Sequence, residues 1–333
     1  MATAPLLELR NLSTHYVSSR GTRVVRAVDE LSLTVKAGET LGIVGESGSG
    51  KSTLALTILR LLPTAARIVS GQILFEGEDL VKKSEAEMRS VRGKRIAMIL
   101  QDPMASLNPL FTIGDQVAEP IRVHENVPRK SAWGRARELL RSVRIPSPET
   151  RVTQYPHEMS GGMRQRIVGA IGISCEPRLL IADEPTTSLD LTIQAQYLNL
   201  LRELQREHNL ALIFITHNLG IVAKMCDQIA VMYAGRLVES GPVSRIFNAP
   251  SHPYTEALLS SIPRMSDPKH RLTAIEGQPP DLAAMPPGCS FQPRCLRAFD
   301  RCREEVPPEF RPEADHTSRC WLADPAAVVG SRA

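Results

Sequence analysis

A glycine-rich segment with a lysine near its end is the first feature of the sequence that could do chemistry. It reads Gly-Glu-Ser-Gly-Ser-Gly-Lys-Ser from Gly45 to Ser52 and fits the pattern G-x-x-x-x-G-K-[ST] in full. Glycines let the chain curl so that successive N–H groups point inward at phosphate oxygens. Lys51 would neutralise the β and γ phosphates, and Ser52 would offer its hydroxyl to Mg²⁺. The segment therefore predicts a phosphate-binding loop, rather than a turn that only joins a strand to a helix.

Two acids and a histidine follow apolar runs that are typical of buried strands. Asp183 and Glu184 end the run from Leu179 to Ala182, and His217 follows the run from Leu210 to Ile215. In a parallel sheet, ligands bind outside the carboxyl ends of the strands. Asp183 is predicted to hold Mg²⁺ and Glu184 to polarise an attacking water. His217 is predicted to hydrogen-bond the γ-phosphate and to hold Glu184 and the water in line. Solvated acids and a structural histidine are the alternatives.

Two further positions could contact the same ligand. Gln101 follows a strand-like apolar run and could reach Mg²⁺ or the attacking water, although a polar cap after a strand has the same composition. Ser160, Gly161 and Gly162 precede an apolar helix predicted from Arg166 to Ile173. The serine would cap this helix and the glycines would bare its N-terminal N–H groups, which predicts a second phosphate-binding site. An ordinary helix cap without a ligand is the alternative.

Four of the six cysteines lie in one 32-residue window with the spacing C-x5-C-x6-C-x17-C. They are Cys289, Cys295, Cys302 and Cys320. The spacing differs from the C-x2-C pairs of zinc ribbons. Four soft thiolates could ligate a [4Fe-4S] cluster, whose negative charge the interleaved arginines would offset. These arginines are Arg294, Arg297, Arg301 and Arg303. Zinc and four unrelated thiols are the alternatives.

The elements that would position these residues follow from hydrophobic patterning. Apolar and polar residues alternate over Leu6 to Leu12, Leu31 to Val35 and Gln72 to Phe75, as in half-buried antiparallel strands. Thr40 to Val44 is a short apolar run that predicts a strand covered on both faces. Residues Ser52 to Leu62 are apolar at helical spacing. The glycine-rich loop is thus predicted to join a buried strand to a helix.

The composition changes twice along the chain. Residues 103–158 carry seven prolines around a helical stretch from Ser131 to Val143, which indicates an inserted helical subdomain. The α/β pattern then returns from Ser160 to about Ser240. Residues 250–325 hold 13 of the 25 prolines, which indicates a separate C-terminal extension.

The overall composition is ordinary for a soluble globular protein. The chain has 333 residues, a net charge of +4, 42% hydrophobic residues and 4% aromatic residues. This charge gives no bulk attraction to nucleic acid, and so few aromatic residues leave little material for stacking bases. No apolar run approaches the ~20 residues of a membrane helix, and residues 1–10 lack a signal-peptide pattern. The length predicts roughly two domains. We expect the protein to lie in the cytoplasm or to dock on a membrane through a partner.

Together with Ser188-Leu189-Asp190, these motifs resemble those of the ATP-binding subunits of ABC transporters, over residues 6 to about 245. The resemblance implies an α/β fold: a RecA-like P-loop core with an antiparallel β subdomain, an inserted α-helical subdomain and a small C-terminal metal-binding extension. It also implies Mg²⁺ held by Ser52, Gln101 and Asp183. The implied boundaries are 1–102 and 160–248 for the ATPase core, 103–159 for the helical subdomain and 249–333 for the extension.

The resemblance further implies a head-to-tail dimer, in which the loop of one subunit and the Ser160 helix of the other enclose ATP. Asp190 would lie at the dimer seam, and Tyr16 matches the aromatic residue that stacks on adenine. Met163 stands where the family usually has Gln. This difference changes the side-chain contact at that position, but the backbone N–H donors of the helix start are the same. The implied nucleotide contacts are Tyr16, Gly45, Glu46, Ser47, Gly48, Ser49, Gly50, Lys51, Ser52, Thr53, Ser160, Gly161 and Gly162.

The C-terminal extension has a resemblance of its own. Ser251 to Thr255 opens a short amphipathic helix with Tyr254, Leu258, Leu259 and Ile262 on its apolar side. His252-Pro253-Tyr254 resembles the signature of the peptide-importer branch of the family. The cysteine pattern is similar to that of the dipeptide-importer D-type ATPase subunits, where an iron–sulfur cluster is implied.

The resulting prediction is the ATP-hydrolysing subunit of an importer for di- or oligopeptides, at the cytoplasmic face of the cell membrane. Lys51, Glu184, His217 and Gln101 form the predicted catalytic set. The implied partners are two permease subunits, a second ATPase subunit that is a related chain in preference to an identical one, and a substrate-binding protein, with no nucleic acid. The alternatives are a nickel or glutathione importer of the same branch, a soluble ABC-type ATPase of DNA repair or translation, and a non-hydrolysing regulatory partner.

Overall fold

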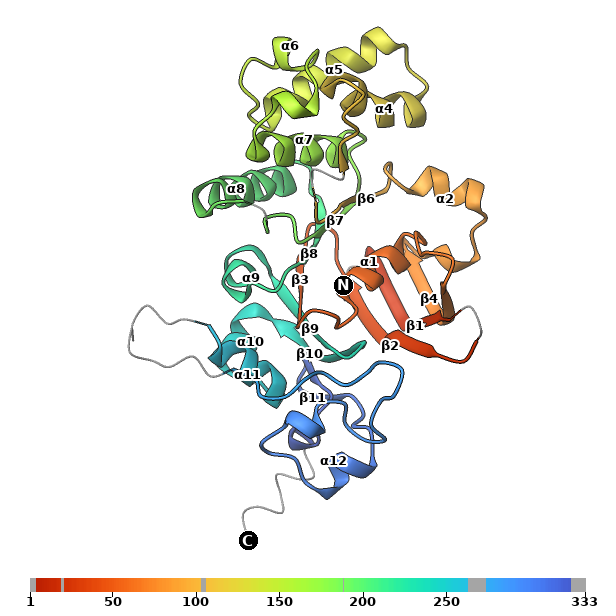
Figure 1. The fold of residues 1–333 in the computed structure, drawn as a ribbon, viewed down its shortest axis with the longest axis vertical. Coiled ribbons are helices and arrows are strands. Elements are labelled where there is room, and N and C mark those ends of the chain that lie inside the picture. Colours follow the sequence, from red (N-terminus) through yellow and green to blue (C-terminus); the bar gives the residue numbers. More distant parts are fainter. Residues whose placement is uncertain (1–3, 19–20, 103–105, 188, 263–273, 325–333) are drawn as a thin grey trace. The chain divides into compact units, whose positions relative to one another are not determined.

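The computed structural model describes residues 4–18, 21–102, 106–187, 189–262 and 274–324 (Figure 1). The chain divides into two compact units. The first comprises residues 1–6, 36–39 and 82–215, and the second comprises residues 7–35, 40–81 and 216–333. Pro103 and Ser188, which the sequence prediction included, lie outside the described residues. In the described residues, no helix is both long and apolar enough to span a bilayer.

The first unit is built on three parallel strands. They are β6 (Ile96–Ile99), β7 (Leu179–Asp183) and β8 (Ala211–Ile215). Ile96 pairs with Leu179, and Leu179 pairs with Ala211, so the strands end at the same edge. Every residue of β7 and β8 is buried, which explains their continuous apolar sequences. All three strand-like runs predicted for this unit, which precede Gln101, Asp183 and His217, are confirmed.

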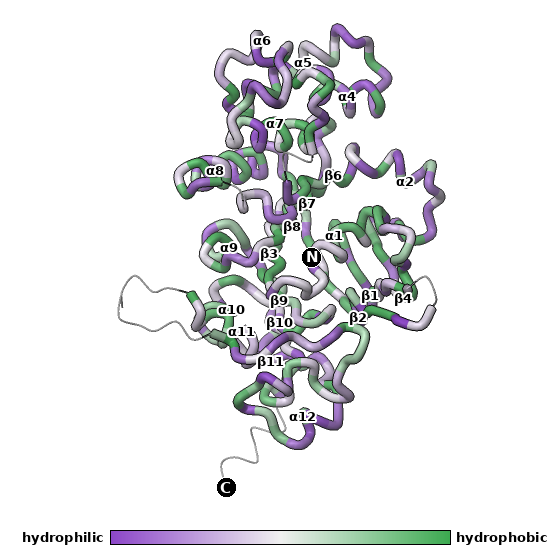
Figure 2. Tube along the Cα trace, viewed as in Figure 1, coloured by the Kyte–Doolittle hydropathy of each residue, from purple (hydrophilic) through white to green (hydrophobic). Residues whose placement is uncertain are grey.

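Helices make up the rest of the first unit. They are α2 (Glu85–Val91), α4 (Ile113–Glu125), α5 (Arg129–Ser142), α6 (Pro148–Arg151), the 3₁₀ turn Pro156–Glu158, α7 (Gly161–Ile173) and α8 (Leu191–Glu207). Figure 2 shows green and purple alternating along α8, whose buried face includes Tyr197, Leu201 and Leu204. The helix predicted from Arg166 begins instead at Gly161, because the two glycines continue the helical backbone from the Ser160 cap.

The second unit contains an antiparallel sheet with the strand order β2-β1-β4-β5. These strands are β2 (Val24–Val35), β1 (Leu7–Val17), β4 (Ala66–Phe75) and β5 (Glu78–Asp79). The three predicted strands are confirmed but are longer than predicted. Register shifts interrupt the pairing of β1 with β2, the first of them between Leu9 and Leu12. The regular alternation of apolar and polar residues therefore ends before the strand does.

The other strands of the second unit follow the order β11-β12-β10-β9-β3. They are β3 (Thr40–Val44), β9 (Gln228–Tyr233), β10 (Arg236–Pro242), β11 (Phe310–Glu313) and β12 (His316–Ser318). β3 is buried along its length, as predicted, and is parallel to β9. β11 and β12 come from the C-terminal extension, where the sequence had predicted no strand, because three or four residues are too few for an alternation to be read.

The helices of the second unit are short. They are α1 (Lys51–Ile58), α9 (Leu219–Met225), α10 (Val243–Asn248), α11 (Pro253–Ser260), α12 (Asp300–Glu304) and the 3₁₀ turns Gln292–Arg294 and Trp321–Ala323, with a further 3₁₀ turn, Leu80–Lys82, following β5. α1 ends at Ile58, four residues before the predicted end, since Arg60 takes a left-handed conformation with a φ of 52°. α11 is confirmed, with Leu258, Leu259 and Ile262 packed against the core that contains Tyr254.

Candidate functional site

The glycine-rich loop lies between β3 and α1, and its glycines are required by close backbone contacts. Gly45 has a φ of 152°, and a Cβ there would lie 2.1 Å from the carbonyl oxygen of Met232. Gly50 has a φ of 100°, and a Cβ there would lie 2.0 Å from the carbonyl oxygen of Ala27. No larger residue fits either position, so the curled loop that the motif predicts depends on these two glycines.

Lys51 folds back over the loop that precedes it. Its Nζ donates to the carbonyl oxygens of Gly45 and Glu46, each at 2.8 Å, and to Ser49 Oγ at 3.3 Å. Gly50 is the N-cap of α1 and offers no side-chain cap, so the helix N-terminus is left to interact with another acceptor. A buried ammonium beside a helix N-terminus is an arrangement that favours a bound phosphate.

Two other predicted residues of the second unit adjoin this loop. Tyr16 OH and Thr53 Oγ1 lie 3.4 Å apart, which brings the predicted adenine-stacking residue beside the first turn of α1. The N–H of Thr216 donates to the carbonyl oxygen of Ile43 at 3.2 Å. His217 therefore follows directly on a residue bonded to β3, the strand that leads into the loop.

In the first unit, the predicted water-polarising acid is held by two donors. Gln101 Nε2 donates to Glu184 Oε2 at 3.1 Å, and Thr187 Oγ1 donates to the same oxygen at 3.0 Å. Glu184 has a φ of 46°, a conformation that costs a non-glycine residue about 1–3 kcal/mol and that recurs at functional sites. Asp183 is the last residue of β7 and directly precedes Glu184, and its side chain is buried. The structure thus brings Gln101 and Glu184 together, as their predicted roles require.

The N-terminus of α7 has the predicted serine cap. Ser160 Oγ accepts from the N–H of Met163 at 3.4 Å. A Cβ at Gly161 would meet nothing within 4 Å, whereas one at Gly162 would lie 2.8 Å from the side chain of Ile193. Gly162 therefore lets α7 approach the first turn of α8, and Gly161 leaves open space beside the start of α7. Asp190 caps α8, since its Oδ1 accepts from the N–H groups of Thr192 and Ile193.

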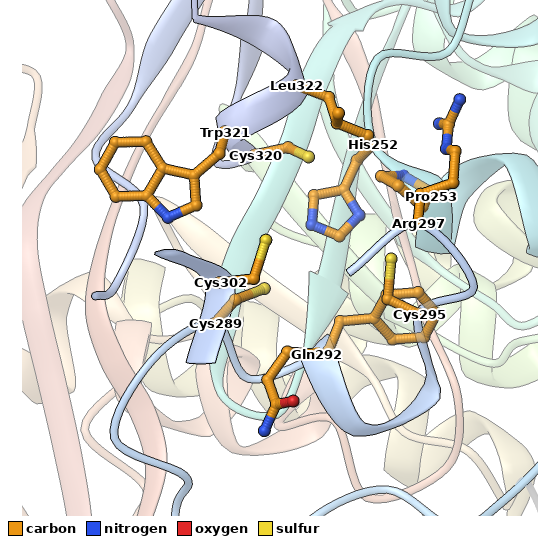
Figure 3. A pocket seen from close by; sticks show the side chains of 11 residues that line it. His252, Pro253, Cys289, Gln292, Cys295, Arg297, Cys302, Cys320, Trp321 and Leu322 are labelled. Atoms are coloured by element: carbon orange, nitrogen blue, oxygen red, sulfur yellow. The ribbon is translucent and has the colours of Figure 1, made fainter. Parts of the chain in front are cut away.

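Figure 3 shows a pocket lined by all four cysteines of the extension together with His252, Trp321 and Leu322. Burial raises the pKa of Cys289 to about 11 and that of Cys320 to about 12, and it also raises the pKa of Cys295. These three thiols are therefore protonated near neutral pH unless a cation stabilises the thiolates. Within the described ranges, no three His, Cys, Asp or Glu side chains are arranged to hold a single metal ion.

His252 faces this pocket with an N–H group. Its Nδ1 accepts from the N–H of Tyr254 at 3.0 Å, and burial lowers its pKa to about 4. The neutral ring therefore carries its proton on Nε2. This Nε2 is buried and has no hydrogen-bond partner in the part of the chain that the structure describes. A buried donor without a partner indicates that the pocket is built for a group that accepts a hydrogen bond.

Sequence reasoning missed two residues that contact the phosphate-binding loop. The N–H of Glu46 donates to Tyr254 OH at 2.9 Å, and the carboxylate of Glu46 pairs with Arg294. The sequence analysis placed Tyr254 on an apolar helix face and in the His252-Pro253-Tyr254 signature, and it placed Arg294 among the cysteines. No local pattern could signal either contact, because 208 and 248 residues separate the partners.

Comparisons with known proteins extend over most of the chain. Residues 28–187 match the family model of the ABC transporter, and residues 238–302 match the family model of the oligopeptide/dipeptide transporter C-terminal region. The chain is 50% identical over 321 residues to a probable peptide ABC transporter ATP-binding protein of Sinorhizobium fredii, which covers 96% of this chain and 95% of that protein. It is 47% identical over 323 residues to the dipeptide transport ATP-binding protein DppD of Bacillus subtilis, covering 97% of this chain and 96% of that one.

Solved structures share the fold. A dimeric ATP-binding cassette, MJ0796, bound to ADP and Pi, has a TM-score of 0.64 at 24% identity and covers 71% of this chain and 98% of its own. CbiO1 from Clostridium perfringens, part of the ABC transporter complex cbiONQ, has a TM-score of 0.62 at 28% identity and covers 74% of this chain and 92% of its own. The mixed sheet with a helical subdomain is thus that of ABC-type ATPases.

Proposed function

The chain belongs to the ATP-binding proteins of ABC transporters, as the ATPase subunit of a peptide importer, and we propose that it powers the uptake of di- or oligopeptides across the cytoplasmic membrane. The observation that carries this proposal is that one chain matches two family models. The ABC transporter match, residues 28–187, contains the hydrogen-bonded pair Gln101 and Glu184, and the peptide-transporter match, residues 238–302, follows it. The second match is to a region of peptide transporters, which favours transport over a soluble ATPase of DNA repair or translation.

In the proposed mechanism, the loop and Lys51 hold the β and γ phosphates of ATP. Ser52, Asp183 and Gln101 would be the ligands for Mg²⁺, and the cation would neutralise charge that develops on the phosphates. Glu184 accepts a proton from the attacking water, and His217 contacts the γ-phosphate. The bond between Gln101 and Glu184 supports a shared position beside the reacting water.

We propose that the site is completed by a second ATPase subunit, a related chain in preference to an identical one. The start of α7, with Ser160, Gly161 and Gly162, would contact the γ-phosphate held by the partner, and Asp190 would lie at the seam. The open side of Gly161 supports this role, because an approaching phosphate would meet no side chain there. Tyr16 would stack on the adenine, since it lies beside Thr53.

The same proposal covers the subunits that this chain serves. Two permease subunits would receive the closing motion through the helical subdomain, residues 103–159, and a substrate-binding protein would deliver the peptide. The ATPase core would comprise residues 1–102 and 160–248, with residues 249–333 as the extension. The protein would then be peripheral, on the cytoplasmic side of the membrane.

We further propose that Cys289, Cys295, Cys302 and Cys320 hold a [4Fe-4S] cluster. Two observations support it: all four thiols line one pocket, and the N–H of His252 faces that pocket without a partner among the described residues. Sulfur is a hydrogen-bond acceptor, so a sulfur-rich group suits this donor. When bound, the cluster would cross-link the segments that carry its ligands.

The experiment that tests the proposed activity replaces Lys51. The Lys51→Ala variant loses the ammonium that binds the terminal phosphates, so steady-state ATPase activity in the assembled transporter is expected to fall to background. Lys36→Ala is the matched control, since Lys36 is an exposed lysine before β3, and it should retain full activity. Persistent ATPase activity in Lys51→Ala would refute the assignment.

A further inference from the structure

Glu46, the second residue of the phosphate-binding loop, is held by three separate groups. Its carbonyl oxygen accepts from Lys51 Nζ, within the loop itself. Its N–H donates to the hydroxyl of Tyr254, and its carboxylate pairs with Arg294. Two of the three contacts therefore come from the C-terminal region, and together they fix both the peptide plane and the side chain of one loop residue.

The ion pair between Arg294 and Glu46 has the geometry of a strong contact. Arg294 Nη1 donates to Glu46 Oε2 at 2.7 Å, and Nη2 donates to Oε1 at 3.0 Å, so the pair is bidentate. Only 3% of the Arg294 side chain is exposed, and it also donates to Tyr233 OH and to the carbonyl oxygens of Ile275 and Glu276. A buried guanidinium with this many acceptors cannot relocate without cost, so the position of Glu46 depends on it.

The residues that hold Glu46 are neighbours, in the chain, of residues that line the cysteine pocket. Arg294 precedes Cys295, and Tyr254 lies two residues after His252. Phe291, also in the pocket wall, packs against Tyr254 and Tyr233 with ring centroids 5.3 and 5.2 Å apart. Tyr233 and Tyr254 pack at 4.6 Å. An unbroken set of packed side chains thus joins the pocket to the loop inside one compact unit.

We propose that Tyr254 and Arg294 are positioning residues of the phosphate-binding loop, through which the C-terminal extension sets the affinity for ATP. The proposal rests on the proposed binding of ATP by this loop. Each residue fixes a different part of Glu46, so loss of either lets the loop amides and Lys51 leave the arrangement that cradles phosphate. Nucleotide binding and the arrangement of the cysteine pocket are then linked reciprocally.

The test measures the Kd of a fluorescent ATP analogue with Mg²⁺ for the full chain and three variants. Tyr254→Phe removes one hydroxyl, Arg294→Met removes the guanidinium, and Glu46→Gln weakens the ion pair from the other side. Each is expected to raise Kd about tenfold, and Arg294→Met should have a smaller effect in the Glu46→Gln background than in the wild type. In the assembled transporter, Tyr254→Phe and Arg294→Met should raise KM for ATP while kcat at saturating ATP changes less than twofold, which a partly unfolded enzyme would not show.

The matched control is Arg23→Gln. Arg23 Nη2 pairs with Asp281, so this variant also removes an ion pair between the C-terminal region and the segment before β2, but an exposed one between residues outside the phosphate-binding loop. Its Kd should equal that of the wild type. Wild-type Kd values for both Tyr254→Phe and Arg294→Met, with unchanged thermal unfolding, would overturn the positioning role of these residues and leave the proposed ATP binding intact. Failure of the wild-type protein to bind the analogue would overturn the proposed ATP binding itself.

Discussion

Glu184 takes a left-handed backbone conformation immediately after a buried strand. Its N–H donates to the carbonyl oxygen of Ile215 at 2.9 Å, and its carboxylate accepts from Gln101 and Thr187. The neighbouring strand and two side chains therefore hold a conformation that is rare for a glutamate. Strained backbone conformations of this kind recur at functional sites, which agrees with the proposed catalytic role of Glu184.

Substitution of this one carboxylate separates ATP binding from hydrolysis. Glu184→Gln keeps the size of the side chain and removes its ability to accept a proton, so we expect ATP binding to persist while hydrolysis falls at least 100-fold. The nucleotide-bound dimer should then accumulate, measurable by size-exclusion chromatography with ATP and Mg²⁺. A variant that hydrolyses ATP at the wild-type rate would contradict the role of Glu184 as base. Glu176→Gln, at the turn after α7, is a control that should stay active.

The side chain of Asp115 connects helices α4 and α5 by hydrogen bonds. Asp115, in α4, accepts from Thr112, from Arg129 and from Trp133, the last two in α5. Burial alone would raise the pKa of Asp115, but these hydrogen bonds outweigh it and lower the pKa below its ordinary value of 3.8. The charged form is thus the one that the folded state stabilises.

A pH dependence of stability follows from this contact between α4 and α5. Because the folded pKa is the lower one, the stabilisation is complete well above pH 3.8 and is lost as the pH falls below that value. Asp115→Asn should lower the free energy of unfolding by about 1 kcal/mol at neutral pH and flatten the acid dependence. Urea unfolding at a series of pH values measures both, and equal acid dependence in the variant and the wild type would exclude this role.

Elements with long, regular patterns were predictable, and elements fixed by distant partners were not. The strands β3, β7 and β8 are apolar apart from Thr40 at the start of β3 and Asp183 at the end of β7, so burial on both faces could be predicted directly. β12 has three residues and exists because Glu239 and Ser240 of β10 pair with it. Arg294 likewise acquires its partner Glu46 only in the folded chain. Motif spacing therefore predicted the loop, while the contacts that hold it from the C-terminal region required the structure.

The molecule as a whole adds to an ATPase fold an extension that carries its own proposed cofactor. Protein purified anaerobically should contain iron and acid-labile sulfide in equal amounts, and Cys295→Ser should lose both, since one of four thiolates is removed. Cys175→Ser is the control, because Cys175 lies in the first unit, outside the pocket. Zinc without sulfide would contradict the cluster, as would full iron retention in Cys295→Ser.

The strand β12 also covers the outer side of β10. Without it, β10 would present unpaired N–H and C=O groups to any passing chain, the situation from which intermolecular strand addition starts. A chain shortened to end at residue 262 should therefore self-associate, giving larger species in light scattering than the full-length protein. The cysteine-rich tail would in that case serve as a guard against aggregation, independently of any metal that it binds.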